Sequence, residues 1–153
     1  MSDSRSKGGK KGKGATRFTG RGLSTRVKTA KGRKTSSTRW LQRQLNDPYV
    51  AEAQVRGLRS RAAFKLLELD ERFAILKPGD RVVDLGAAPG GWTQIVLERI
   101  GPQGTVIAVD QNVMEPLSGA AVMQLDIFDE NAPEEIRRAL GGPADVVLSD
   151  MAP

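Results

Sequence analysis

The sequence predicts an α/β fold in which four parallel strands alternate with helices. Short β-branched runs recur between residues 81 and 149, and longer amphipathic stretches separate them. Such alternation indicates a parallel sheet with right-handed crossovers. Each run also ends in Gly or Asp, which suits the carboxyl edge of an open α/β sheet, where ligands bind.

Two helices are expected ahead of the sheet, and order is expected to begin near Trp40. Asp47 and Pro48 mark the start of the first helix, with Asp as the N-cap and Pro in the first turn, and Gly57 ends it. The second helix is expected over residues 61–73, because its apolar side chains share one broad face.

The strands and the later helices follow a turn at residues 77–80. The helix that begins at Pro133 carries acids in its first turn and arginines near its end, which favours the helix macrodipole. The strands are expected at residues 81–86, 105–109, 121–125 and 144–148, and the two later helices at residues 91–100 and 133–140. A Gly-Pro pair ends the first of these helices and a Gly-Gly pair ends the second.

Charge divides the chain into a basic segment and an acidic domain. Residues 1–45 carry 14 Lys and Arg and one acid, whereas residues 46–153 carry 10 Lys and Arg and 17 acids. Residues 1–38 contain almost no apolar side chains, so we expect a disordered tail, with the folded domain over residues 39–153. The tail is expected to bind RNA phosphates, and the alternative is a solvated tail that aids solubility.

Composition excludes several kinds of chemistry. With no Cys and no His, the chain has no disulfide, thiolate nucleophile, Ser-His-Asp triad or Cys/His zinc site. No apolar run approaches the roughly 18 residues that span a bilayer. The N-terminus lacks the apolar core of a secretory signal. We therefore expect a soluble, cytoplasmic protein with no membrane or metal partner.

A Gly-rich loop follows the first strand at residues 86–92. Glycines let a ligand approach the backbone, and the following helix N-terminus offers free N–H donors. The loop departs from the dinucleotide pattern, because Ala88 stands at the third position and Pro89 lacks an N–H. This favours a ligand with an amino-acid end and a nucleoside, the alternative being a tight turn without a ligand. The expected binding residues are Gly86, Ala87, Pro89, Gly90, Gly91 and Trp92.

Carboxylates stand at the ends of the later strands. Asp110, about 20 residues beyond the loop, can accept hydrogen bonds from both ribose hydroxyls of a nucleoside. Both NAD and S-adenosylmethionine contain such a ribose. Asp126 can accept from an adenine amino group, and Asp150 would face the reactive end of a ligand. The alternative for all three is a carboxylate that caps its own loop. Lys65 is a further candidate, its alternative being a solvated helix face.

Three motifs follow one another along the chain. They are Ser60-Arg61-Ala62-Ala63-Phe64-Lys65-Leu66, Val82-Val83-Asp84-Leu85-Gly86-Ala87-Ala88-Pro89-Gly90-Gly91-Trp92 and Ser149-Asp150-Met151-Ala152-Pro153. In this order they resemble the FtsJ/RrmJ (RlmE) family of S-adenosylmethionine-dependent RNA ribose 2′-O-methyltransferases. Stretches at residues 37–41, 47–50 and 57–61 look like the bacterial large-subunit rRNA branch in particular, so the resemblance covers residues 37–153.

The resemblance implies a Rossmann-like methyltransferase fold that methylates a uridine ribose in 23S rRNA of the large ribosomal subunit. Its cofactor would be S-adenosylmethionine, with the Gly-rich loop at the methionine end, Asp110 at the ribose and Asp126 at the adenine. Lys65 and Asp150 match the first Lys and the Asp of the family's Lys-Asp-Lys-Glu set. That set surrounds the methyl group and the RNA 2′-hydroxyl, so Asp150 would also border the cofactor.

The family's second Lys, its expected general base, and its Glu lie beyond the final motif, as do its later strands. We therefore expect a C-terminally truncated fragment with little activity alone, an open edge at the fourth strand and uncovered apolar surface. Three alternatives stay open. They are a non-catalytic RNA-binding or ribosome-assembly remnant, a tRNA 2′-O-methyltransferase, which the Trp40 segment disfavours, and an NAD-dependent oxidoreductase, which Pro89 disfavours.

Overall fold

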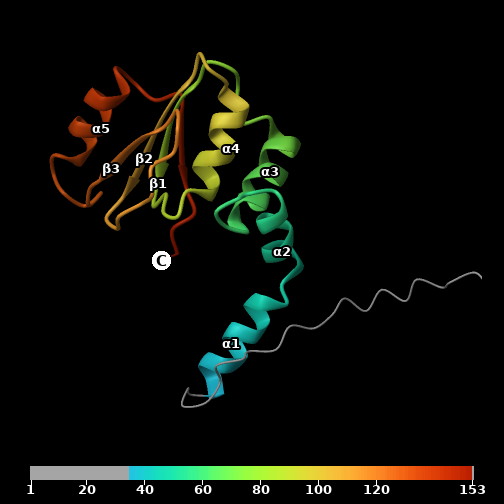
Figure 1. Ribbon diagram of the computed structural model, residues 1–153. Coiled ribbons are helices and arrows are strands. Elements are labelled where there is room, and N and C mark those ends of the chain that lie inside the picture. The colour runs from blue at the N-terminus through green and yellow to red at the C-terminus, as the bar shows by residue number, and fades with distance from the viewer. Residues whose placement is uncertain (1–34, 153) are drawn as a thin grey trace, which may run out of the picture.

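The computed structural model describes residues 35–152 (Figure 1). Most of the predicted basic tail, residues 1–34, lies outside the described residues. The tail prediction was wrong for residues 35–38, because they form the start of helix α1 (Thr35–Leu45). That helix was not expected, since its apolar residues are too few to form a recognisable face. It extends away from the sheet in Figure 1, with Trp40 exposed.

Helices α2 (Pro48–Val55) and α3 (Ala62–Phe73) confirm the two helices predicted before the sheet. The Asp47 carboxylate caps α2 by accepting a hydrogen bond from the Tyr49 N–H at 2.8 Å. The predicted apolar face of α3 is buried except at Phe73, which is exposed. Phe73 is the last helical residue, and the chain turns away at Ala74 in a left-handed conformation.

Four parallel strands form one sheet in the order β3-β2-β1-β4, which confirms the predicted fold class. Three begin where predicted. The last begins two residues later than expected. Just before it, the Asp145 N–H donates to the Arg81 carbonyl, whereas the Arg81 N–H donates to the Asp145 carboxylate rather than to a backbone carbonyl, both at 2.8 Å. The strands are β1 (Arg81–Leu85), β2 (Thr105–Asp110), β3 (Ala121–Gln124) and β4 (Val146–Ser149).

Helices cover the two faces of the sheet unequally (Figure 1). On one face, α3 and α4 (Gly91–Ile100) build the larger core cluster around Leu66 and Ile95. On the other face, α5 (Ala132–Leu140) packs against β2 through Leu140. The two central strands are therefore buried on both sides, as continuous apolar runs predict.

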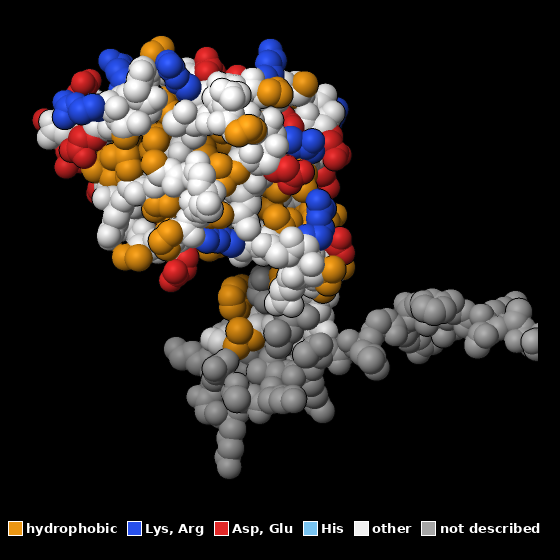
Figure 2. Space-filling model, turned by 45° about the horizontal axis from the view of Figure 1, so that its top comes forward, with side chains coloured by type: hydrophobic (Ala, Val, Ile, Leu, Met, Phe, Trp, Pro, Cys, Tyr) orange, Lys and Arg blue, Asp and Glu red, His pale blue; other side chains and the backbone are white. Residues whose placement is uncertain are grey.

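Part of the second face is uncovered in the described part of the chain. A hollow of about 610 Å³ lies between α5 and the strands β1 and β4, lined almost entirely by apolar side chains. Strand β4 forms one edge of the sheet, and its Val147 is 60% exposed. Figure 2 shows hydrophobic side chains gathered on the side of the molecule that carries α5. The expected open edge and apolar surface are thus present.

Candidate functional site

The carboxyl ends of the strands enclose a cavity of about 320 Å³. Three residues predicted as ligand contacts from different segments, Gly86, Asp110 and Asp126, meet in its wall. The sheet order explains this, because β1, β2 and β3 are neighbours and all run in the same direction. The lining residues are Gly86, Asp110, Gln111, Asn112, Leu125, Asp126, Ile127, Phe128, Met151 and Ala152.

Two glycines of the loop serve protein packing. Gly86 has φ +72°, which favours glycine, and a Cβ there would lie 2.3 Å from Met151 Cγ, so a larger residue would displace the Met151 side chain. A Cβ on Gly91 would lie 2.2 Å from Ser60 Oγ. The loop is therefore pressed against the segment that precedes α3, a reason for glycine that the sequence did not reveal.

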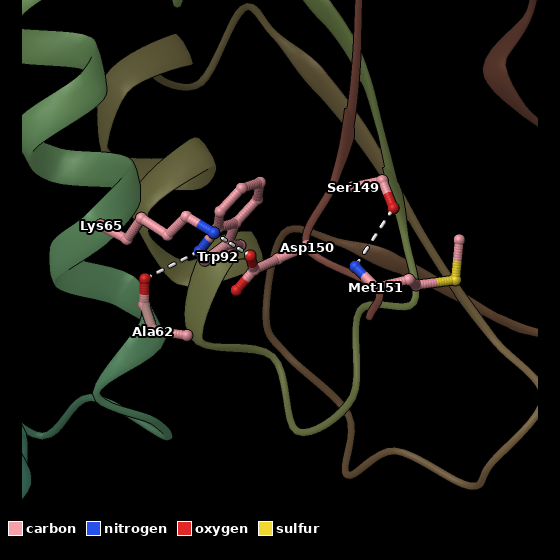
Figure 3. A network of polar contacts seen from close by, with 6 residues as sticks. All are labelled: Ala62, Lys65, Trp92, Ser149, Asp150 and Met151. Atoms are coloured by element: carbon pink, nitrogen blue, oxygen red, sulfur yellow. Dashed lines mark hydrogen bonds and ion pairs between the residues drawn. The ribbon is translucent and has the colours of Figure 1, made fainter. Parts of the chain in front are cut away.

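The other predicted loop contacts do not line this cavity. Ala87, Gly90 and Gly91 are buried within the protein. Trp92 is also buried, packed in the core with its indole N–H donating to the Ala62 carbonyl at 2.7 Å (Figure 3). The structure thus brings Gly86 to the cavity and places Trp92 on the side facing α3.

Asp110 and Asp126 each cap a loop while lining the cavity. Asp110 accepts from the N–H groups of Ala88 at 2.9 Å and Asn112 at 2.8 Å, and so ties the Gly-rich loop to the segment after β2. Asp126 accepts from the Phe128 N–H at 2.9 Å. The capping interpretation and the ligand interpretation are therefore compatible, and capping holds both carboxylates in fixed positions.

A third carboxylate, Asp84 in β1, was not predicted as a site residue. It is 2% exposed and accepts a hydrogen bond from the Thr93 hydroxyl at 2.7 Å. Burial raises the pKa of Asp84 to about 6, the Thr93 hydrogen bond opposes this, and the charges of Asp110 and Asp150 add to the rise. An Asp within a buried β-branched run was the available signal for it.

Lys65 and Asp150 come together although they are far apart in sequence. The Lys65 ammonium on α3 donates to the Asp150 carboxylate just after β4, and Nζ lies 5.9 Å from the centre of the Trp92 ring (Figure 3). The Lys65 and Asp150 side chains are 61% and 32% exposed, so the ion pair itself contributes little to stability. Its open position leaves both groups accessible to a ligand.

The Lys65–Asp150 pair lines a second hollow that is close to the first cavity along the chain. Asp150 lines this hollow of about 430 Å³, while the next two residues of the chain line the first cavity. A ligand in one hollow would therefore lie next to a ligand in the other. The second hollow is lined by Tyr49, Arg61, Ala62, Phe64, Lys65, Glu68 and Asp150.

Arg59 is another residue with a role that the sequence did not indicate. Its guanidinium donates to the carbonyls of Pro89 at 3.1 Å, Glu115 at 2.6 Å and Pro116 at 2.7 Å. It therefore joins the segment before α3 to the Gly-rich loop and to the loop between β2 and β3. A lone Arg in a basic stretch gives no signal for such a position.

Within the described residues, no cluster of three or more acidic side chains is arranged to hold a metal ion. No helix there combines the length and apolar character needed to cross a membrane.

Comparisons with known proteins all match one family of methyltransferases. A family model described as FtsJ-like methyltransferase matches residues 58–153. A ribosomal RNA large subunit methyltransferase E from Paramagnetospirillum magneticum is 59% identical over 155 aligned residues, covering 95% of this chain and 64% of the relative. A protein of the same name from Rhodospirillum rubrum is 62% identical, covering 86% of this chain and 52% of the relative.

A solved structure shares the fold. The crystal structure of a ribosomal RNA methyltransferase from Plasmodium falciparum superposes with a TM-score of 0.57 at 33% identity. The match covers 62% of this chain and 57% of that one. The chain thus spans less than two thirds of the length of the two bacterial relatives.

Proposed function

Because the chain belongs to the FtsJ-like methyltransferase family, we propose that it binds S-adenosylmethionine and serves 2′-O-methylation of a uridine ribose in 23S rRNA. One observation carries the proposal. The Lys65–Asp150 pair lines a hollow open to solvent, and the two residues that follow Asp150 line the cavity at the carboxyl edge of the sheet.

The residues of the first cavity suit the proposed cofactor. Asp110 would accept from the ribose hydroxyls, Asp126 from the adenine amino group, and the backbone around Gly86 would contact the methionine end. When bound, S-adenosylmethionine supplies a methyl group already activated by a sulfonium cation. The neighbouring carboxylates of Asp84, Asp110 and Asp150 favour a cation at this edge, because opposite charges attract strongly in a partly dry site.

Lys65 and Asp150 would position the RNA. A ribose hydroxyl is a poor nucleophile at neutral pH, so a cation that stabilises developing negative charge on its oxygen favours the reaction. We assign this role to the Lys65 ammonium, with Asp150 holding it in place. A lysine serves as a base only when it is desolvated, and the open position of Lys65 supports orientation rather than proton removal.

Cofactor binding is the direct test. Titration calorimetry of the 153-residue chain is expected to show saturable binding of S-adenosylmethionine and none of NADH. Asp110→Ala is expected to weaken binding by about tenfold or more, because it removes the ribose acceptor and releases the loop at Ala88. The matched control is Asp129→Ala, since Asp129 caps Asn131 outside the cavity.

The outcomes separate the competing functions. RNA binding without cofactor binding would support the RNA-binding remnant, and NADH binding would support the oxidoreductase.

The role of Lys65 is tested by Lys65→Ala in the protein as it is produced in its own cells. Methyl transfer from tritiated cofactor to large-subunit rRNA is expected to fall by about 100-fold. Cofactor affinity should stay unchanged. Undiminished transfer would remove Lys65 from the mechanism.

A further inference from the structure

The hollow of about 430 Å³ beside Lys65 lies apart from the proposed cofactor site. None of its lining residues lines the cofactor cavity, although Asp150 of this hollow and Met151 of that cavity are consecutive residues of the chain. A ligand in this second hollow would therefore lie against the Lys65 ammonium without occupying the cofactor cavity.

An aromatic side chain is held ready in this hollow. Tyr49 lines it and remains 51% exposed, and its ring centre lies 5.7 Å from that of Phe64 at an angle of 48°. Phe64 is in turn covered by the guanidinium of Arg56, whose Cζ lies 5.4 Å from the ring centre. An aromatic ring with fixed neighbours loses little conformational entropy when a flat ligand stacks on it.

The start of α2 fixes the backbone of Tyr49 as well. Asp47 accepts from the Tyr49 N–H at 2.8 Å and forms an ion pair with Arg61 at the start of α3. One carboxylate therefore ties the aromatic residue of α2 to the helix that carries Lys65. Arg61 and Lys65 supply positive charge to the hollow, and Glu68 supplies an acceptor.

We propose that this hollow binds an unpaired nucleotide of the RNA, with its base stacked on Tyr49 and its phosphate near Arg61. The inference rests on the proposed function, in which the ribose lies at the Lys65–Asp150 pair. Single-stranded RNA is recognised by stacking bases on aromatic side chains while cations neutralise the backbone. An acidic peptide fits less well, because it carries no flat base to stack on the exposed Tyr49 ring.

The first experiment measures binding of a fluorescein-labelled, uridine-rich RNA of about ten nucleotides to the 153-residue chain. Moderate salt is used so that phosphate contacts elsewhere in the chain contribute less. Tyr49→Leu keeps an apolar side chain against Phe64 but removes the stacking surface, and is expected to weaken binding by about 5- to 100-fold. Tyr49→Phe keeps the ring and should bind like the wild type.

Phe73→Leu is the control, because Phe73 is also an exposed aromatic residue of this region but does not line the hollow. Its RNA affinity should not change. S-adenosylmethionine affinity should be the same in all four proteins, which shows that each variant is folded. Failure of the wild type to bind the cofactor would count against the proposed function, whereas equal RNA affinity of Tyr49→Leu and wild type would overturn this inference alone.

The second experiment locates the base directly. With 4-thiouridine in the same RNA, ultraviolet crosslinking followed by peptide mapping is expected to mark the segment around Tyr49. Crosslinks confined to other segments would overturn the proposal. Competition of this RNA by an acidic peptide, lost in Tyr49→Leu, would likewise overturn it by assigning the hollow to a protein partner.

Discussion

Asp84 is the carboxylate that the fold encloses most completely at the candidate site. Its 2% exposure and the nearby charges of Asp110 and Asp150 make its ionised form unfavourable. The pKa of Asp84 is raised from 3.8 to about 6, so the unfolded chain releases this proton more readily than the folded chain. The stabilising contribution is therefore complete below about pH 4 and is lost as the pH rises through about 6.

Asp84→Asn should remove this pH dependence, because the amide oxygen still accepts from the Thr93 hydroxyl while no charge forms. Between about pH 4 and pH 8, the wild type should lose about 3 kcal/mol of stability relative to the variant. Urea unfolding of both proteins at the two pH values measures the difference. Asp129→Asn serves as control, and a wild-type profile parallel to that of Asp84→Asn would contradict the assignment.

Cofactor binding should depend on the same carboxylate. A sulfonium cation placed near Asp84 would favour its ionised form, so binding would expel the proton. Affinity for S-adenosylmethionine is therefore expected to rise as the pH increases through about 6, and less so in Asp84→Asn. Adenosylhomocysteine, which lacks the sulfonium charge, should show a weaker dependence. Titrations at a series of pH values test this, and equal pH profiles for both ligands would refute it.

The sequence predicted where a site residue lies when its type and its position at the end of a strand were enough. Asp110 and Asp126 follow β-branched runs, and both line the cavity. Tyr49 and Arg59 gave no signal, because their roles depend on partners 15 to 57 positions away that only the fold brings near. Gly91 was predicted only as a ligand contact, and nothing in the sequence indicated that it also makes room for Ser60.

At the scale of elements, strands and buried helices were predictable to within one or two residues. Their boundaries coincide with Gly, Pro and capping Asp residues, whose backbone preferences act locally. Helix α1 was not predicted, because it carries few apolar residues and one of them, Trp40, is exposed. The later start of β4 was also not predictable from the sequence, since it accompanies a hydrogen bond from the Arg81 N–H in another strand to the Asp145 carboxylate.

The segment between α2 and α3 lines the second hollow through Arg61. Through Arg59 it contacts the Gly-rich loop and the loop between β2 and β3. The planar guanidinium of Arg59 satisfies three carbonyls of two loops, which a lysine ammonium cannot span. Arg59→Lys is therefore expected to weaken S-adenosylmethionine binding by about tenfold, through loss of loop position. Isothermal titration measures this effect.

The neighbouring Arg61→Lys is the matched control, because Arg61 pairs with Asp47 and lines the second hollow, the one proposed to bind RNA. It should leave cofactor affinity unchanged. If both variants bind the cofactor like the wild type, Arg59 does not position the site. If both weaken it equally, the effect belongs to the whole segment.

Within residues 35–152, the sheet as a whole is well covered on the α3–α4 face and incompletely covered on the other. The apolar hollow of about 610 Å³ and the half-exposed edge strand β4 lie next to each other, since Val147 belongs to both. The resemblance to longer proteins predicted this exposure, whereas strand patterning alone did not. Open strand edges and uncovered apolar surface both favour association with another chain.

The 153-residue chain is therefore expected to bind the apolar dye anilinonaphthalene sulfonate and to self-associate as its concentration rises. Val147→Lys places a charge in the hollow, where Val147 is 60% exposed, and should reduce both effects without unfolding the protein. Val55→Lys changes an even more exposed valine on α2 and should alter neither. Dye fluorescence and sedimentation velocity give the two readouts. Equal behaviour of the two variants would mean that association occurs through another surface, and that the β4 edge is protected by its twist or by its neighbours.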